Sequence, residues 1–190
     1  AVGYYGATTS NELMTELSNA GNDFLANTCV DWEDSYNSFI NANIRTSVIR
    51  VGIVLSHEGG AYQKMYKPFK YGLGSAIASG KHYFPWIHIH DVANLFLYAA
   101  LNDTMCGTFN AVASGTPTNL QFSEALAASF NKKLLLPNVP KFILKLALGE
   151  RVMTLTEGVQ ISNEKIKLQG FKFEYDDLKK ALLNLANNAK

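Results

Sequence analysis

Residues 46–55, with the sequence TSVIRVGIVL, decide the expected fold of this chain. The stretch is apolar almost throughout and lacks the alternation of a half-exposed strand. This pattern is typical of a strand buried on both faces, as in a parallel sheet with helical covers. A helix is expected before it, over residues 24–42, because Asp23 can cap the first turn and apolar residues recur at helical spacing. A helix followed by a buried strand is part of a βαβ repeat, so the sequence predicts an α/β fold.

The first six residues, AVGYYG, contain no initiator Met and no polar lead-in. They are expected to end a buried strand and to run into a polar surface loop over residues 7–22. Because a parallel strand needs neighbours, we expect those neighbours to lie upstream of Ala1, so that the chain is the rear portion of a larger protein. Strand edges near Val2 and Val48 would then be covered by a separate N-terminal half or by another copy of the chain.

The composition changes near residue 57 and predicts two units. Residues 1–56 are expected to be the remnant of a parallel sheet, and residues 57–190 a smaller mixed α/β lobe. The end signals of the helices are clear: Thr118 and Gln121 form a capping box, and Asp91 is expected to be an N-cap. The lobe is expected to contain helices over about 61–71, 92–101, 118–130, 140–149, 162–168 and 176–189, and extended segments over 83–89, 109–112 and 134–136.

The bulk composition excludes several classes of protein. A chain of 190 residues that is 47% hydrophobic can build one core plus a small satellite. The net charge of +1, without a basic stripe, argues against nucleic acid as a partner. No apolar run reaches the roughly 18 residues of a membrane span, so no membrane partner is expected. Cys29 and Cys106 form no CxxC motif and are expected to be buried, reduced thiols of a cytoplasmic protein.

Three separated segments carry motifs whose order and spacing are informative together: AVGYYG (residues 1–6), RVGIVL (residues 50–55) and WIHIHD (residues 86–91). They resemble, in this order, the strand end, the following strand and the C-terminal helix start of extended short-chain dehydrogenases/reductases. More narrowly, the chain resembles the C-terminal two-thirds of the atypical, sugar-nucleotide-epimerase-like branch of the NAD-dependent epimerase/dehydratase family. The segments that carry this narrower resemblance are Phe24-Leu-Ala, Trp32-Glu33, Gly59-Gly-Ala61, Pro68-Phe69, Gly72-Leu-Gly74 and Trp86-Ile-His88.

The resemblance implies a two-lobed protein that binds NAD or NADP. Residues 1–56 would be the C-terminal part of its Rossmann-like domain, and residues 57–190 its substrate-side domain. The family's main phosphate-binding loop is absent from this chain, since Gly72-Leu-Gly74 follows no expected strand. The implied function is part of an NAD(P)-dependent epimerase/dehydratase-like protein that acts on a small polar metabolite such as a nucleotide sugar. The alternative is a non-catalytic NAD(P)-binding or assembly protein.

The family's catalytic pair of Tyr and Lys, four residues apart on one helix, is not expected here. In that pair the lysine lowers the phenol pKa from about 10, so that the tyrosine can exchange a proton during hydride transfer. The expected helix over residues 24–42 holds no such pair. The string does occur at Tyr66/Lys70 and at Tyr175/Lys179, but both lie past the buried strand and are interpreted as chance. No catalytic residue is therefore assigned, and activity stays open.

Four residues are candidates for contact with the cofactor: Tyr4, Tyr5, Arg50 and Gly52. The two tyrosines would lie at the carboxyl end of a parallel strand, where open α/β sheets bind ligands, although ordinary packing would also explain them. An arginine in an apolar strand must either pair with a carboxylate or meet an anionic ligand, and structural pairing is the favoured interpretation.

Three residues are candidates for the substrate pocket: Lys81, Trp86 and His88. Lys81, His82 and Trp86 flank a glycine loop and would suit a phosphate or a sugar, although solvated loop residues are the simpler interpretation. His88 and His90 share a face if the strand continues, but Asp91 would then point away, so no metal site is predicted. A serine hydrolase is not expected either, since no GxSxG elbow is present.

Overall fold

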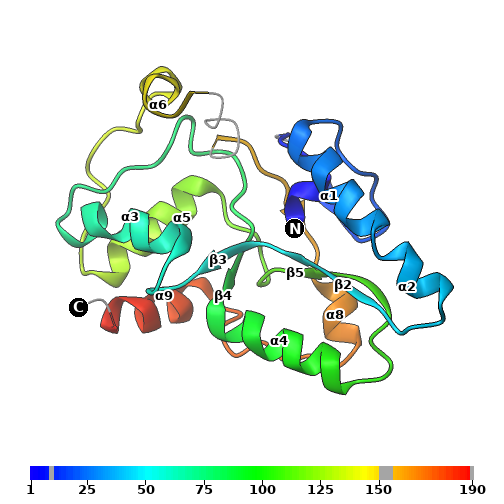
Figure 1. Cartoon of the computed structure of the whole chain (residues 1–190). Coiled ribbons are helices and arrows are strands. Elements are labelled where there is room, and N and C mark those ends of the chain that lie inside the picture. Colours follow the sequence, from blue (N-terminus) through cyan, green and yellow to red (C-terminus); the bar gives the residue numbers. More distant parts are fainter. Residues whose placement is uncertain (9–10, 150–155, 189–190) are drawn as a thin grey trace.

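The structure is a computed structural model that describes residues 1–8, 11–149 and 156–188, and it has the predicted α/β class (Figure 1). The strands are β1 (Leu13–Met14), β2 (Ser47–Val51), β3 (Ile53–Leu55), β4 (Trp86–His88), β5 (Gly107–Ala111) and β6 (Gln160–Ile161). The helices are the 3-10 helix η1 (Val2–Tyr5) and α1 (Phe24–Asp34), α2 (Asn37–Asn41), α3 (Gly60–Lys70), α4 (Ile89–Leu101), α5 (Asn119–Ser129), α6 (Lys141–Leu148), α8 (Glu164–Leu168) and α9 (Leu178–Asn187).

The described strands form three parallel pairs, β2 with β5, β3 with β4, and β1 with β6. The predicted single strand over residues 46–55 is divided at Gly52. A Cβ at Gly52 would lie 2.8 Å from both the Pro85 carbonyl oxygen and Val112 Cγ1, so the close approach of these segments requires glycine here. Because β4 and β5 follow residue 57, strand pairing crosses the predicted domain boundary, which stays a prediction.

The prediction of a strand end at residues 1–6 is wrong. Residues Val2–Tyr5 form the 3-10 helix η1, which ends at Gly6 with φ +80°. The predicted loop over residues 7–22 also contains a short strand, β1, whose partner β6 lies at residues 160–161. A two-residue strand with so distant a partner leaves no periodic signal in the sequence.

The predicted helix over residues 24–42 is interrupted, so that α1 and α2 are separate helices. Asp23 caps α1 as predicted, because its Oδ1 accepts N–H groups of Leu25 and Ala26 at 2.9 and 3.0 Å. Burial would raise the pKa of Asp23, but its backbone hydrogen bonds outweigh this and lower the pKa. The apolar side of α1 is only partly covered: Cys29 is buried, whereas Phe24 is 80% exposed.

Most of the later elements follow their end signals. The capping box of Thr118 and Gln121 is present, and α6 is bounded by Pro140 and Gly149 as expected. The strand predicted over 134–136 is wrong, since this segment is irregular and Leu135 is largely exposed. Cys106 is exposed rather than buried. The predicted end of the last helix, at residue 189, lies outside the described residues.

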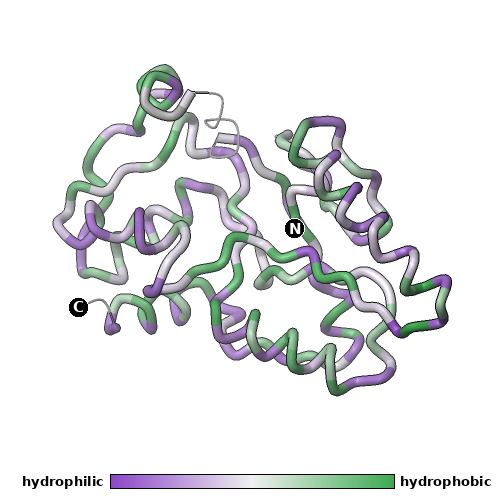
Figure 2. Tube along the Cα trace, in the orientation of Figure 1, coloured by the Kyte–Doolittle hydropathy of each residue, from purple (hydrophilic) through white to green (hydrophobic). Residues whose placement is uncertain are grey.

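Helices cover the strands from different sides (Figure 1). The buried side chains form three clusters. The first joins β3 and β4 to α3, α5 and α9, and the second joins β5 to α4 and α8. The third packs Tyr5 of η1 against Met14, Val112, Val159 and Ile161. The central strands are mostly hydrophobic, whereas the helices mix both kinds of residue (Figure 2). Across the described ranges, no helix combines the length and the apolar character that a membrane crossing demands.

Candidate functional site

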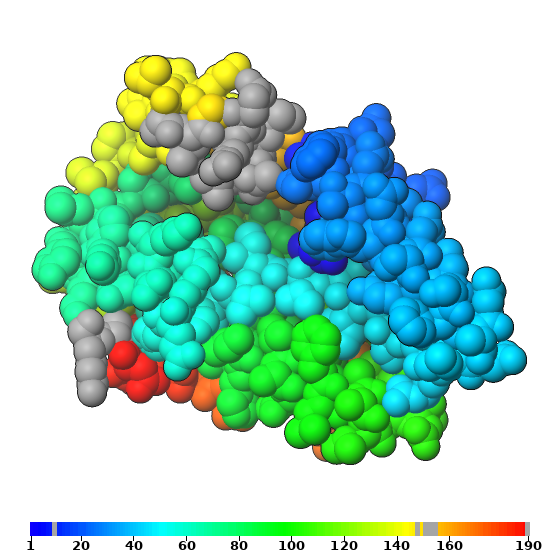
Figure 3. Space-filling view, viewed as in Figure 1, coloured from blue at the N-terminus to red at the C-terminus, as the bar shows by residue number. Residues whose placement is uncertain are grey.

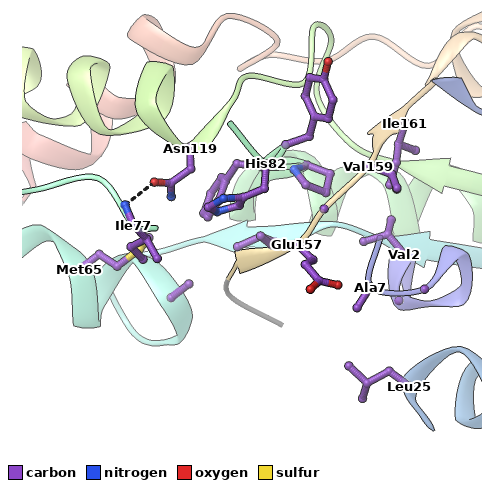
Figure 4. A pocket seen from close by; sticks show the side chains of 18 residues that line it. Val2, Ala7, Leu25, Met65, Ile77, His82, Asn119, Glu157, Val159 and Ile161 are labelled. Carbon is purple, nitrogen blue, oxygen red and sulfur yellow. Dashed lines mark hydrogen bonds between the residues drawn. The ribbon is translucent and has the colours of Figure 1, made fainter. Parts of the chain in front are cut away.

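A cavity of about 270 Å³ lies between the N-terminal segment and the elements that follow residue 52. In the space-filling view the N-terminal segment stands beside the body of the molecule, with a hollow between them (Figure 3). One wall is formed by Val2, Gly3, Gly6, Ala7 and Leu25, and the opposite wall by Ile53, Ala61, Met65 and Ile77. Residues 82–85, Asn119 and residues 157–159, with Ile161, complete the lining (Figure 4). The cavity therefore combines segments from both predicted units.

The cavity has few polar side chains. Asn119, at the first position of α5, uses its carbonyl oxygen to accept the N–H of Ile77 at 2.8 Å (Figure 4). Glu157 points its carboxylate toward the hollow, and its Oε1 lies 3.4 Å from Nζ of Lys141. The ring of His82 is almost fully buried in the lining. The side-chain amide of Asn119, the Glu157 carboxylate and the His82 ring are thus the groups placed to orient a ligand.

Arg50 lies at the centre of a separate group that we call the Arg50 cluster, made of Tyr4, Tyr5, Glu33, Arg50 and Asn110. Nε and Nη2 of Arg50 donate to the two carboxylate oxygens of Glu33, each at 2.8 Å. Nη1 donates to the Tyr5 hydroxyl at 3.0 Å, and this hydroxyl donates to Asn110 Oδ1 at 2.6 Å. The guanidinium also lies 3.3 Å from the ring centroid of Tyr4, a cation–π contact.

Burial and pairing act in opposite directions in the Arg50 cluster. Burial disfavours the charged guanidinium, but the hydrogen bonds with Glu33 and Tyr5 outweigh it and raise the pKa of Arg50. Burial raises the pKa of Tyr5, although its bonds with Arg50 and Asn110 act against the change. Tyr5 therefore remains a neutral phenol whose hydroxyl donates a hydrogen bond to Oδ1 of Asn110. The whole cluster is internally satisfied, and its arginine has the carboxylate partner that the sequence analysis favoured.

None of the seven predicted site residues lines the cavity. Tyr4, Tyr5 and Arg50 come together in the Arg50 cluster, whereas Gly52 packs against Pro85 and Val112. The substrate candidates do not come together: Lys81 is exposed on a loop, and Trp86 and His88 are buried in β4. Their assignment to cofactor and substrate contacts stays a prediction.

His88 and Asp91 serve the packing of the C-terminal segment. The strand ends at His88, so His88 and His90 do not share a strand face, and Nδ1 of His88 accepts the N–H of His90 at 3.2 Å. Asp91 is not the N-cap that was predicted. Its fully buried carboxylate accepts the N–H groups of Glu174 and Tyr175 at 2.8 and 2.9 Å. Burial lowers the pKa of His88, and its ring stacks on Tyr175 with centroids 4.0 Å apart.

The sequence analysis missed most of the polar lining. Asn119 lies inside the capping box of Thr118 and Gln121, and this box alone accounts for the local sequence. Glu157 precedes a glycine and belongs to no motif. Gly158 itself is the one usable signal, because a Cβ there would collide with the Tyr83 carbonyl oxygen, and a close backbone approach of this kind needs glycine. His82 was considered only as a neighbour of the glycine loop. These residues become a site only through the tertiary structure.

Parallel strands flanked by helices, with a cavity beside the passage from β2 to β3, define an α/β protein of the Rossmann-like class. Residues 139–185 match a domain of unknown function, DUF1731. The chain is 34% identical over 182 residues to the mouse epimerase family protein SDR39U1. The alignment covers 95% of this chain and 61% of that protein. It is 35% identical to the chloroplastic homologue from Arabidopsis thaliana, over 96% of this chain and 52% of the relative.

A solved structure agrees with these sequence matches. The crystal structure of the human epimerase family protein SDR39U1 with NADPH superposes with a TM-score of 0.90 at 30% identity, over 99% of this chain and 63% of that one. Over almost its whole length the chain is therefore similar to proteins of the NAD-dependent epimerase/dehydratase family, in the atypical short-chain dehydrogenase/reductase branch, as the motifs indicated. It spans less than two-thirds of the length of these relatives.

Proposed function

We propose that this chain is the substrate-side part of an NAD(P)-dependent protein of the epimerase family, and that its small-molecule ligand lies in the cavity. The observation that carries the proposal is the similarity to the human protein solved with NADPH, which extends over 99% of this chain. Such a cofactor supplies hydride transfer when it is bound. The chain supplies the enclosure, the polar groups that orient the substrate, and the exclusion of water.

The residues present fit only one end of a dinucleotide. Gly3, Gly6 and Ala7 line one wall of the cavity without bulky side chains, which leaves room for a flat nicotinamide ring. The glycines at 72 and 74 offer no phosphate cradle, because they follow the helix α3 and the Phe69 ring fills the space where a Gly74 side chain would stand. No described segment has the G-x-G-x-x-G turn between a strand and a helix that is typical of a pyrophosphate site. A further segment of the protein would have to hold the phosphates.

The reaction would proceed without the standard pair of Tyr and Lys. The sequence of α1, FLANTCVDWED, contains neither residue. Tyr66 stacks on Tyr62 and Phe130, and Tyr175 stacks on His88, so both tyrosines of the chance motifs are used in packing. The side-chain amide of Asn119 and the His82 ring would orient the reacting group. Glu157 would set the charge of the cavity.

The second candidate is a non-catalytic NAD(P)-binding or assembly protein, and the composition of α1 favours it. The nucleotide would then stabilise a surface that partners recognise. A nucleotide-sugar substrate, a cytoplasmic location, and the covering of strand edges by an N-terminal half or a second copy stay predictions. One relative is named as a chloroplastic protein, which concerns that protein alone.

The test is a titration of NADPH, followed by the fluorescence of the reduced nicotinamide. The chain would be compared with a version extended upstream by the nucleotide-binding segment of a relative. We expect micromolar binding by the extended version and much weaker binding by the chain alone. Tight binding together with oxidation of NADPH by any compound in a carbonyl panel supports the enzyme, and tight binding without turnover supports the second candidate. Absence of binding to the extended version would contradict both.

A further inference from the structure

The lining of the cavity is strongly apolar and carries a negative charge. Most of the walls are aliphatic or aromatic side chains, and among the lining residues that the structure describes there is neither an arginine nor a lysine. The carboxylate of Glu157 is the one acidic group of the same set. Its partner Lys141 lies on α6 outside the lining, and the Lys141 side chain is half exposed. An anionic ligand would therefore meet a carboxylate inside an apolar enclosure.

A nucleotide sugar whose diphosphate lay in this cavity would require the opposite arrangement. Its diphosphate is recognised by arginine or lysine side chains, or by free N–H groups at the start of a helix. The start of α5 is already occupied, because Thr118 Oγ1 accepts the N–H of Gln121, and Gln121 Oε1 accepts the N–H of Thr118. The start of α3 reaches the cavity through Ala61 alone. Transfer of a charged phosphate into such a lining would be costly, since none of the described lining residues carries a cation that would replace its hydration.

The size of the cavity points in the same direction. About 270 Å³ lies just below the range of volumes that small-molecule sites occupy, roughly 300–1,000 Å³. The polar groups on the wall, the Asn119 amide and the His82 ring, are enough to hold a single oxygen function. The other walls offer only apolar contact, from residues such as Met65, Ile77 and Val159.

We infer that the substrate of this site is an uncharged, predominantly apolar small molecule with one carbonyl or hydroxyl group, rather than a nucleotide sugar. The inference rests on the proposed function, because it names the substrate class of the same cavity. It differs from the small polar metabolite that the sequence analysis predicted. Apolar walls would hold the carbon skeleton, the Asn119 amide and His82 would bind the oxygen, and Glu157 would exclude anions.

The experiment compares two ligands with the same ring system, 2-naphthol and 2-naphthoate, of which only the second is anionic at neutral pH. Uncharged 2-naphthamide, which matches 2-naphthoate in size, is the control for the larger substituent. Binding to the chain without any cofactor would be followed by ligand-observed NMR and calorimetry, with UMP and UDP-glucose as nucleotide probes. We expect 2-naphthol to bind at least tenfold more tightly than 2-naphthoate, and neither nucleotide to compete with it. Replacement of the carboxylate in Glu157→Gln should narrow the difference between the two naphthalenes.

Variants on opposite walls test whether the ligand occupies this cavity. Ala61→Phe and Ala7→Phe each fill it from one side and should weaken 2-naphthol binding at least tenfold. Lys133→Ala, at an exposed residue outside the lining, should not weaken it. Thermal unfolding would identify any variant that fails to fold. If one filling variant fails to fold, binding of 2-naphthol to the other tests whether the ligand occupies the cavity. Binding of UMP or 2-naphthoate as tightly as 2-naphthol would overturn the inference. So would 2-naphthol binding that both filling variants leave unchanged, or no binding of 2-naphthol at all.

These outcomes are separable from failure of the proposed function. If 2-naphthol binds as expected but the extended protein never binds NADPH, the cavity chemistry stands and the dinucleotide proposal fails. If the extended protein oxidises NADPH with a nucleotide sugar, the dinucleotide proposal stands and the substrate class inferred here is wrong.

Discussion

The Arg50 cluster and the cavity are both built on the first seven residues, but their polar atoms are used differently. Tyr4 and Tyr5 contact the guanidinium of Arg50, while Val2, Gly3, Gly6 and Ala7 line the cavity. In the cluster each charged group has a charged or hydrogen-bonded partner inside the protein. In the cavity the polar side chains are few and stand among apolar walls. The conspicuous charge in β2 is therefore paired inside the protein. The candidate site is formed instead by residues that the sequence analysis did not predict as site residues.

The largest loss of stability is expected from replacing Arg50. Arg50→Met removes the cation but leaves the Glu33 carboxylate and the Tyr5 hydroxyl in place, so we expect the free energy of unfolding to fall by about 3 kcal/mol. Urea denaturation would measure this. The matched control is Asp103→Asn, which removes a fully exposed carboxylate 3.8 Å from Arg45 and should leave the midpoint unchanged. Equal effects of the two substitutions would contradict the view of Arg50 as a buried, paired charge.

A smaller loss is expected from Tyr5→Phe. The change removes the hydroxyl that donates to Asn110 and accepts from Arg50, and should lower the free energy of unfolding by about 1 kcal/mol. Tyr4→Phe is the control, because it keeps the ring that packs on the guanidinium, and its effect should stay within about 0.5 kcal/mol. If Tyr4→Phe were the more damaging change, the hydroxyl network would not be what holds the cluster together.

Acid should act on His88 and His57, because burial favours the neutral form of both rings in the fold. Burial lowers the pKa of His88, and also that of His57, so both stay neutral in the fold at pH values where the unfolded chain is already protonated. Stability is therefore complete above the unfolded pKa of about 6.5 and falls as the pH drops toward the lower folded pKa. Urea denaturation between about pH 8 and about pH 5 would follow this. The change in the free energy of unfolding with pH should be smaller in His88→Phe, which keeps a ring against Tyr175. If this pH dependence were unchanged, His88 would not be its cause.

The smallest change in stability is expected on the cavity side. Glu157→Gln removes a carboxylate whose partner Lys141 is half exposed, so the free energy of unfolding should change by less than about 0.5 kcal/mol. The same substitution is expected to change ligand selectivity, whereas Arg50→Met is expected to change stability. A loss of stability as large as that of Arg50→Met would show that Glu157 is a structural residue instead.

The sequence alone determined the features whose causes are local. The strand around residue 50, the cap at Asp23, the capping box at Thr118 and the ends of α6 all depend on residues within a few positions of one another. The predicted burial of this strand on both faces is not confirmed, since most residues of β2 are only half-buried. The order of short motifs also indicated the family. Periodicity and capping act over one or two turns of chain, so one sequence is enough to recognise them.

Only the tertiary structure decided which residues meet. It paired Arg50 with Glu33, moved Asp91 from an expected cap to a buried anchor for residues 174–175, and wound residues 2–5 into a 3-10 helix. It also brought Ala7, Met65, Asn119 and Glu157 to one cavity. The physical reason is that an ion pair or a cavity wall requires side chains that are close in space but far apart along the chain, and no local pattern records that distance.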